Sequence, residues 1–150
     1  FMGLVGSEMC IRDSFIIDTS AFDNEEFESN SGFKTKSVKK TFINPEIINE
    51  SGDLKLFEEG CLSIPNIREN INRKSEIKIK YQDENFNIHV DSFDGIVARV
   101  IQHEYDHLEG VLFTDRISPF KKKLIKGKLK NIITGDVPVD YVMNFFKSQS

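Results

Sequence analysis

The segment His103-Glu104-Tyr105-Asp106-His107 constrains this chain more than any other, because it places two histidines at positions i and i+4. In a helix with about 3.6 residues per turn, such side chains lie one above the other, so both imidazoles can reach one ion. The carboxylate of Glu104 would lie beside that ion, where it can take a proton from an attacking water and return it to a leaving group. The pattern predicts a helix that carries a hydrolytic metal site. The alternative is a surface helix with two ordinary histidines.

The flanking residues predict where this helix begins and ends. Asp94 suits an N-cap and Gly110 a C-terminal stop, which together bracket a helix of about four turns. Apolar stripes run into the histidine pair and place it on the core-facing side of the helix. The stripes are Ile96, Val100, His103 and His107, and beside them Val97, Ile101, Glu104 and Leu108. The remaining polar side chains are expected to face solvent: Arg99, Gln102, Asp106 and Glu109.

Two imidazoles need a third protein ligand, because catalytic metal sites usually have three ligands and one open position. No His or Cys follows His107, and the carboxylates on that side are Glu109, Asp115, Asp136 and Asp140. Glu109 is too close along the same helix to complete the site easily. The upstream candidates are Cys10, Cys61 and His89.

Of the upstream candidates, Cys61 is favoured as the third ligand. His89 is predicted to face solvent, because Phe86, Ile88 and Val90 alternate with it as the buried face of a strand. Cys61 follows a glycine and precedes a proline, which suits a bent strand edge. A lone cysteine is more often a small buried apolar residue. Next to a histidine pair that lacks a third ligand, however, the thiolate role is favoured.

Two segments of the chain carry a resemblance to a known family. Glu59-Gly60-Cys61-Leu62-Ser63 and Gln102-His103-Glu104-Tyr105-Asp106-His107-Leu108-Glu109-Gly110, in this order, resemble the second and third motifs of the peptide deformylases. The similarity runs from about Phe15 through the helix after Ser118. The resemblance implies that Cys61, His103 and His107 bind one divalent metal, usually ferrous iron, and that Glu104 is the general acid and base.

The same resemblance implies the reaction and the substrate contacts. The reaction is hydrolysis of the N-formyl group from the initiator methionine of nascent polypeptides, with release of formate. The resemblance also assigns the backbone N–H of Leu62 to the oxyanion hole. The edge formed by Gly60 and Leu62 could accept an extended peptide by strand addition, and Arg68 could help to place it. An ordinary surface arginine is an equally good interpretation of Arg68.

The identity of the metal and the catalytic role are not fixed by the motifs. One thiolate with two imidazoles also suits Zn²⁺, Ni²⁺ or Co²⁺. Two other functions stay open: a non-catalytic, metal-stabilised binding domain in which Glu104 is structural, and a different HExxH metalloprotease with a carboxylate as third ligand.

The beginning of the chain departs from the family pattern. The early Gly-rich segment that ends in a Gln is not found before Phe15. Residues 1–14 instead resemble a translated sequencing-adaptor segment. We therefore expect a non-native leader at 1–14 and a deformylase domain at 15–150 that lacks its N-terminal portion. Loss of one oxyanion donor typically costs ~100 to 1,000-fold in turnover, so weak or absent activity is expected.

Composition favours one domain in the cytoplasm. The chain has 150 residues, of which 39% are hydrophobic, which suffices for a single core. No apolar run approaches the ~20 residues of a membrane span, so no membrane contact is expected. A net charge of −4 gives no argument for DNA binding. Two cysteines suit a reducing compartment rather than a disulfide scaffold.

The rest of the chain predicts an α+β fold, with antiparallel or mixed β-sheets packed around the central HExxH helix and followed by a C-terminal helix. Strands are expected at Phe15–Asp18 and Lys40–Asn44, and Glu76–Tyr81 with Phe86–Val90 should form a hairpin. The polar stretch from Asp23 to Lys39 is expected to be a mobile loop.

A last helix is predicted from Ser118, with Ser118 as its cap and Pro119 in its first turn. Its inward residues are expected to be Phe120, Leu124, Ile125 and Leu129. Lysines make the outer side of residues 118–131 basic, which is typical of a solvated face. The family's C-terminal helix indicates an alternative, salt-sensitive contact with ribosomal RNA. The tail from Val137 to Phe146 is apolar and has no assigned partner.

Overall fold

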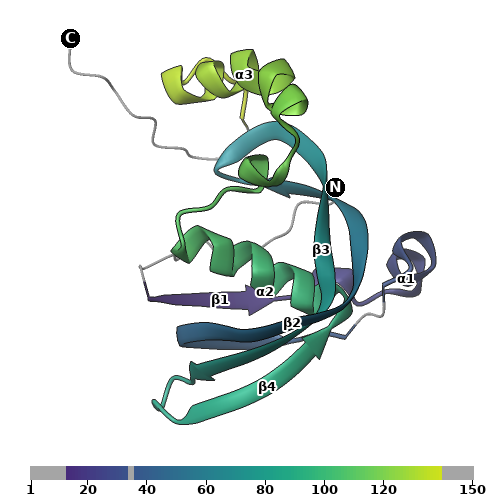
Figure 1. Cartoon of the computed structure of the whole chain (residues 1–150), viewed down its shortest axis with the longest axis vertical. Helices are drawn as coiled ribbons and strands as arrows, with labels where there is room; N and C mark the ends of the chain where they lie inside the picture. The colour runs from purple at the N-terminus through teal and green to yellow at the C-terminus, as the bar shows by residue number, and fades with distance from the viewer. Residues whose placement is uncertain (1–12, 34–35, 140–150) are drawn as a thin grey trace.

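The chain folds around one antiparallel sheet that supports a central helix. The computed structural model describes residues 13–33 and 36–139. Within these ranges the sheet is four-stranded, in the order β1-β2-β3-β4 (Figure 1). Its strands are β1 (Ser14–Asp18), β2 (Lys39–Cys61), β3 (Ile64–Gln82) and β4 (Ile88–Asp94). The helices are α1 (Glu25–Ser31), α2 (Gly95–Leu108) and α3 (Pro119–Thr134), with 3-10 turns η1 (Ser20–Phe22) and η2 (Phe113–Arg116). The predicted α+β class is confirmed.

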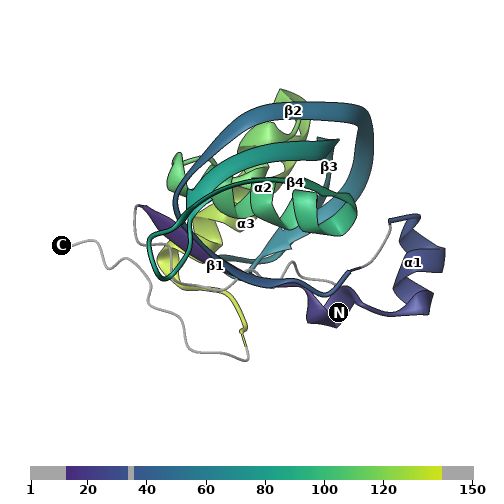
Figure 2. The same ribbon diagram turned by 90° about the horizontal axis from the view of Figure 1, so that it is seen from below.

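The long hairpin of β2 and β3 curves around α2 and determines where the hairpin tip lies. Register shifts interrupt the pairing of β2 with β3 between Ile47 and Asn49 and again between Ser51 and Leu54. Such bulges bend a strand and increase its twist. Beyond them, the two strands rise out of the flatter part of the sheet (Figure 1), and β2 curves past α2 (Figure 2). The end of β2, at Cys61, is thereby carried back toward the helix.

The helix α2 agrees with its predicted bounds. It begins after Asp94, which lies at the N-cap position without a side-chain capping bond, and it ends at Leu108. Gly110 follows in the left-handed region, with φ of 73°, and its N–H donates to the carbonyl of His107. A glycine adopts this φ without the strain that a side chain would bring.

The buried apolar side chains form two clusters. The larger fills the space between the sheet, α1 and the first half of α2, and includes Phe15, Phe42, Ile79, Ile96 and Val100. The smaller lies under α3 and contains Ile64, Ile67, Ile71, Phe113, Ile117, Ile125 and Ile132. The partly buried Cys61 packs against the smaller cluster. None of the described helices combines the length and apolar character needed to cross a bilayer.

The stretch predicted to be a mobile loop contains helix α1, so that prediction is wrong over Glu25–Ser31. The side chain of Asn24 caps the helix by accepting a hydrogen bond from the Phe27 N–H at 2.7 Å. Phe27 and Phe33 are buried, and both rings contact Phe57 of β2. A helix this short, with few apolar residues, shows little apolar periodicity in the sequence, so it could not be predicted from the pattern. It is held in place by contacts with Phe57, which lies far from it along the chain.

The predicted strand Phe86–Val90 is displaced to Ile88–Asp94, and the face assigned to it is wrong. Phe86, Ile88 and Val90 are 67%, 64% and 49% exposed. His89, expected to face solvent, instead stacks on Tyr81 with ring centroids 5.3 Å apart and contacts the Asp83 carboxylate at 2.7 Å. Alternation gives the period of a strand but does not say which face the core covers.

The last helix begins as predicted, but two of its inward residues are assigned wrongly. The Ser118 hydroxyl accepts a hydrogen bond from the Lys121 N–H, and Pro119 opens the helix. Phe120 and Leu124 are 70% and 66% exposed, whereas Ile125 is buried. Leu129, also predicted to face inward, is partly buried, and Ile132 joins Ile125 in the core. The tail prediction lies largely outside the described residues, which end at residue 139.

Candidate functional site

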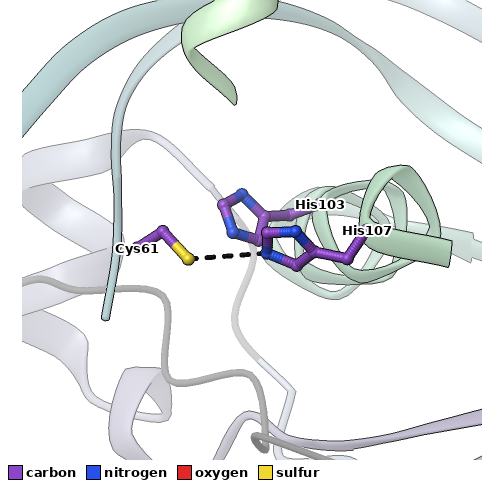
Figure 3. Close-up of side chains that lie close together, drawn as sticks. All are labelled: Cys61, His103 and His107. Atoms are coloured by element: carbon purple, nitrogen blue, oxygen red, sulfur yellow. Dashed lines mark hydrogen bonds between the residues drawn. The ribbon is translucent and has the colours of Figure 1, made fainter. Parts of the chain in front are cut away.

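Cys61, His103 and His107 converge where the end of β2 meets α2. The Sγ of Cys61 lies 3.5 Å from Nε2 of His107, and one potential ligand atom from each of the three residues lies within 4.8 Å of the others. Figure 3 shows the Cys61 sulfur facing both imidazole rings. The rings have centroids 4.9 Å apart and an interplanar angle of 87°. The structure thus brings together all three residues that the sequence singled out as ligands.

The other candidate ligands do not join this group. Among the described residues, the three-membered cluster includes no carboxylate, so Glu109, Asp115 and Asp136 are not brought to the histidines. His89 lies on β4, where it pairs with Asp83. Cys10 and Asp140 lie outside the described residues.

The donor atoms of the cluster suit a divalent cation. Burial raises the pKa of the Cys61 thiol, but hydrogen bonds with His103, His107 and the Ser63 backbone outweigh it and lower the pKa to about 5. Burial lowers the pKa of His103, but Cys61 and Glu59 outweigh it and raise the pKa to about 9, so a metal that binds His103 must displace a proton from it. A thiolate and imidazole nitrogens are the donors that borderline metals such as Fe²⁺ and Zn²⁺ prefer. The donor set therefore fits one transition-metal ion.

Glu59 holds the ring of His103. Its Oε2 lies 3.1 Å from Nδ1 of His103, and its side chain is fully buried. Burial raises the pKa of Glu59, but hydrogen bonds from Arg73 and His103 outweigh it and lower the pKa to about 2. An ionised carboxylate can only accept, so Nδ1 carries the proton and Nε2 is left for a metal.

Two arginines hold Glu59 in turn. Arg73 donates from Nε to Oε1 at 2.6 Å and from Nη2 to Oε2 at 2.9 Å. Arg99 donates from Nη1 to Oε1 at 2.6 Å. The network continues through Asp106, which accepts from Arg73 at 2.7 Å and from Nε of Arg116 at 2.6 Å. The hairpin, α2 and η2 are thereby joined beneath the site.

The prediction that the polar residues of α2 face solvent is wrong for three of them. Arg99, Gln102 and Asp106 are 2%, 4% and 6% exposed, because β3 and the end of β2 cover these sides of the helix. Glu109 is exposed as expected. One signal in the sequence was available: Glu59 belongs to the same short motif as Cys61, and a carboxylate buried there needs cationic partners.

Glu104 is buried beside the cluster, with 4% of its surface exposed. Burial raises the pKa of its carboxyl, while the neighbouring His103 and His107 act in the opposite direction. A carboxyl with a raised pKa is better matched to proton transfer near neutral pH than an ordinary one. The geometry is therefore compatible with an acid and base role.

The residues proposed for substrate contact lie at the hairpin tip. Leu62 stands in the turn between β2 and β3, and Gly60 is paired with Arg68 across the two strands. Arg68 is exposed and forms an ion pair with Glu58, with the two atoms 3.7 Å apart. Both interpretations of Arg68 stay open, since a surface ion pair does not prevent contact with a peptide.

Comparison with known proteins gives one consistent result. The family described as "Polypeptide deformylase" matches residues 10–123. A peptide deformylase of Cytophaga hutchinsonii is 53% identical over 145 residues, which cover 96% of this chain and 74% of that protein. One from Christiangramia forsetii is 50% identical over 132 residues, covering 87% of this chain and 67% of that protein.

Solved structures agree with these relatives. A Plasmodium falciparum peptide deformylase matches with a TM-score of 0.66 and 32% identity, covering 82% of this chain and 66% of that one. Arabidopsis thaliana peptide deformylase 1B matches with a TM-score of 0.68 and 30% identity, covering 83% and 62%. The chain thus spans slightly less than two thirds of these solved relatives. It belongs to the peptide deformylase family, whose members are hydrolases that use a single catalytic metal to remove the N-formyl group from nascent peptides.

Proposed function

We propose that this chain removes the N-formyl group from nascent polypeptides that begin with formylmethionine, in the cytoplasm, and releases formate. The observation that carries the proposal is the convergence of Cys61 with His103 and His107 beside the buried Glu104. Cys61, His103 and His107 would hold one divalent metal. Ferrous iron is proposed on the family resemblance, and the donor set equally accepts Zn²⁺, Ni²⁺ or Co²⁺. When bound, such an ion supplies Lewis-acid polarisation of the formyl oxygen.

Glu104 moves the proton in the proposed reaction. Its carboxylate takes a proton from the attacking water as the water oxygen bonds to the formyl carbon. When the bond from that carbon to the amide nitrogen breaks, Glu104 gives the proton to the departing amine. The products are formate and a free N-terminal amine. The backbone N–H of Leu62 is proposed to donate to the oxygen that becomes negatively charged. Leu62 directly follows the proposed metal ligand Cys61, in the turn between β2 and β3.

The substrate is proposed to bind as an extended strand at the hairpin tip. The backbone at Gly60 and Leu62 would pair with the peptide, and Arg68 would contact its downstream part. Arg68 lies across from Gly60 in the strand register and is exposed, so it could be reached by a peptide at this edge.

The experiment that tests the function measures metal content and hydrolysis of a formyl-Met peptide under anaerobic conditions. Cys61→Ala is expected to lose the metal. Glu104→Ala is expected to keep it while turnover falls by about 10² to 10⁴-fold. Metal binding that is unchanged in Cys61→Ala would refute the ligand set, and turnover that survives in Glu104→Ala would refute the mechanism. The Cytophaga hutchinsonii relative, handled in the same way, is the positive control.

The basic side of α3 is proposed to contact the ribosome. Lys123, Lys126, Lys128 and Lys130 are exposed, whereas Lys121 and Lys122 form ion pairs with Glu69 and Asp115. Contact with RNA phosphates predicts cosedimentation with ribosomes that weakens as salt rises. Cosedimentation that is absent, or unaffected by salt, would favour an ordinary solvated face.

A further inference from the structure

Arg99 is a charged residue buried in the otherwise apolar first half of α2. Only 2% of its surface is exposed. Its Nη1 donates to Oε1 of Glu59 at 2.6 Å and to the carbonyl of Ile71 at 3.1 Å, and its Nη2 donates to the carbonyl of Lys55 at 2.5 Å. Its Nε has no hydrogen-bond partner among the described residues. The guanidinium therefore joins α2 to both strands of the hairpin.

Stability alone is a weak reason for this arrangement. Removing an arginine from water is unfavourable because the charge loses its hydration, and replacing a buried ion pair with well-packed apolar residues often leaves stability unchanged or improved. Arg73 already pairs with Glu59 through both carboxylate oxygens. A second arginine on the same carboxylate is therefore better explained by the orientation it imposes on Glu59.

The contacts show which orientation Arg99 imposes. Both arginines donate to Oε1 at 2.6 Å, whereas Oε2 receives one longer bond from Arg73 and lies 3.1 Å from Nδ1 of His103. Two strong donors on Oε1 fix the rotation of the carboxylate. The second oxygen is thereby held toward the imidazole. Without Arg99, the carboxylate of Glu59 could rotate about its Cγ–Cδ bond toward Arg73.

Arg99 is itself held in place from several sides. Its guanidinium carbon lies 5.6 Å from the ring centroid of Phe33 and 5.5 Å from that of Phe57. The two carbonyls of Lys55 and Ile71 fix its plane. A lysine cannot reproduce these contacts, because a single ammonium cannot reach three separated acceptors in a fixed plane.

We propose that Arg99 is a positioning residue for the metal ligand His103, which it orients through Glu59. This inference rests on the proposed metal site and extends it. Groups that orient a metal-bound histidine typically change metal affinity by about 10 to 100-fold when they are removed.

The test measures the dissociation constant for Zn²⁺ by competition with a chromophoric chelator, and the visible absorption of the Co²⁺-loaded protein. Arg99→Met and Glu59→Gln are each expected to weaken Zn²⁺ binding by about 10-fold or more and to shift the Co²⁺ bands. In the Glu59→Gln background, adding Arg99→Met should change affinity by no more than about 2-fold, because the residue acts through Glu59. An equal loss in both backgrounds would overturn the proposal.

Two further variants separate positioning from general damage to the fold. Gln102→Met removes another buried polar side chain of α2, one that donates to the carbonyls of Lys74 and Ala98 but not to Glu59. Its Zn²⁺ affinity should stay within about 2-fold of the unaltered chain. Arg99→Lys keeps the positive charge but lacks the planar guanidinium with its several donors, so it should also weaken Zn²⁺ binding. Unaltered Zn²⁺ affinity in this variant would overturn the proposal even if Arg99→Met does not fold. Failure of the unaltered chain to bind Zn²⁺ would instead contradict the proposed function.

Discussion

At the scale of single residues, Asp106 connects the buried charges to the surface. It accepts from Arg73, which is 2% exposed at its side chain, and from the partly exposed Arg116. Removing one partner of a buried ion pair leaves a charge without compensation, which usually costs about 3 kcal/mol or more. We therefore expect Asp106→Asn to lower the free energy of unfolding by about 3 kcal/mol. Urea denaturation followed by circular dichroism measures this change.

The control for Asp106 is an exposed carboxylate with an arginine partner. Glu58 pairs with Arg68 at 3.7 Å, and their side chains are 57% and 35% exposed. Solvent screens such a pair, so Glu58→Gln should cost less than about 1 kcal/mol. Equal losses in the two variants would show that the buried network does not stabilise the fold as its geometry indicates.

Residues whose roles depend on local spacing could be predicted, and those that depend on distant partners could not. His103 and His107 share one helix face whatever the rest of the chain does. Cys61 was identified because the pair needed a third ligand. The burial of Arg99 and Asp106 could not be read from the helix alone, since it depends on contacts with Glu59 and Arg73 of the hairpin.

At the scale of elements, β4 gives the sharpest test of which face is buried. Ile88 of β4 is 64% exposed, whereas Ile79 of β3 is fully buried. Replacing a buried isoleucine by alanine typically costs about 2–5 kcal/mol, whereas most surface substitutions change stability by no more than about 0.5 kcal/mol. We expect Ile79→Ala to destabilise the fold by about 2–5 kcal/mol and Ile88→Ala by less than about 1 kcal/mol. Thermal and urea unfolding of the two variants measure the difference. The reverse order would restore the face that alternation predicted.

Elements defined by strong end signals were predicted well, and those defined by packing were not. Ser118 and Pro119 fix the start of α3, and Gly110 follows the end of α2, because these end signals are local properties of the chain. Asp94 lies at the N-cap position of α2 as predicted, although its side chain makes no capping bond. The inward face of α3 is set by the small cluster around Ile71 instead. The length of β2 and β3 likewise depends on their mutual pairing, which a polar, bulged sequence does not reveal.

At the scale of the whole molecule, the candidate metal site lies between the two clusters of buried side chains. Cys61 packs against the smaller cluster, and the first half of α2 belongs to the larger one. Of the described residues, Cys61 and the two histidines alone form the candidate ligand group. An ion held by β2 and α2 together would therefore tie the two parts of the core to each other.

This arrangement predicts that metal binding stabilises the entire fold. A ligand that binds only the folded chain adds about 2.7 kcal/mol at 100 times its dissociation constant and about 4.1 kcal/mol at 1,000 times. Zn²⁺, which does not change oxidation state, should thus raise the melting temperature progressively with concentration, and a chelator should reverse the rise. Cys61→Ala should unfold at a temperature nearly independent of Zn²⁺, because it lacks the ligand that β2 contributes. Scanning calorimetry of both chains over a Zn²⁺ series measures the two slopes. An equal rise in both would mean that Zn²⁺ stabilises the chain at another site, and that an ion at Cys61 does not tie β2 to α2.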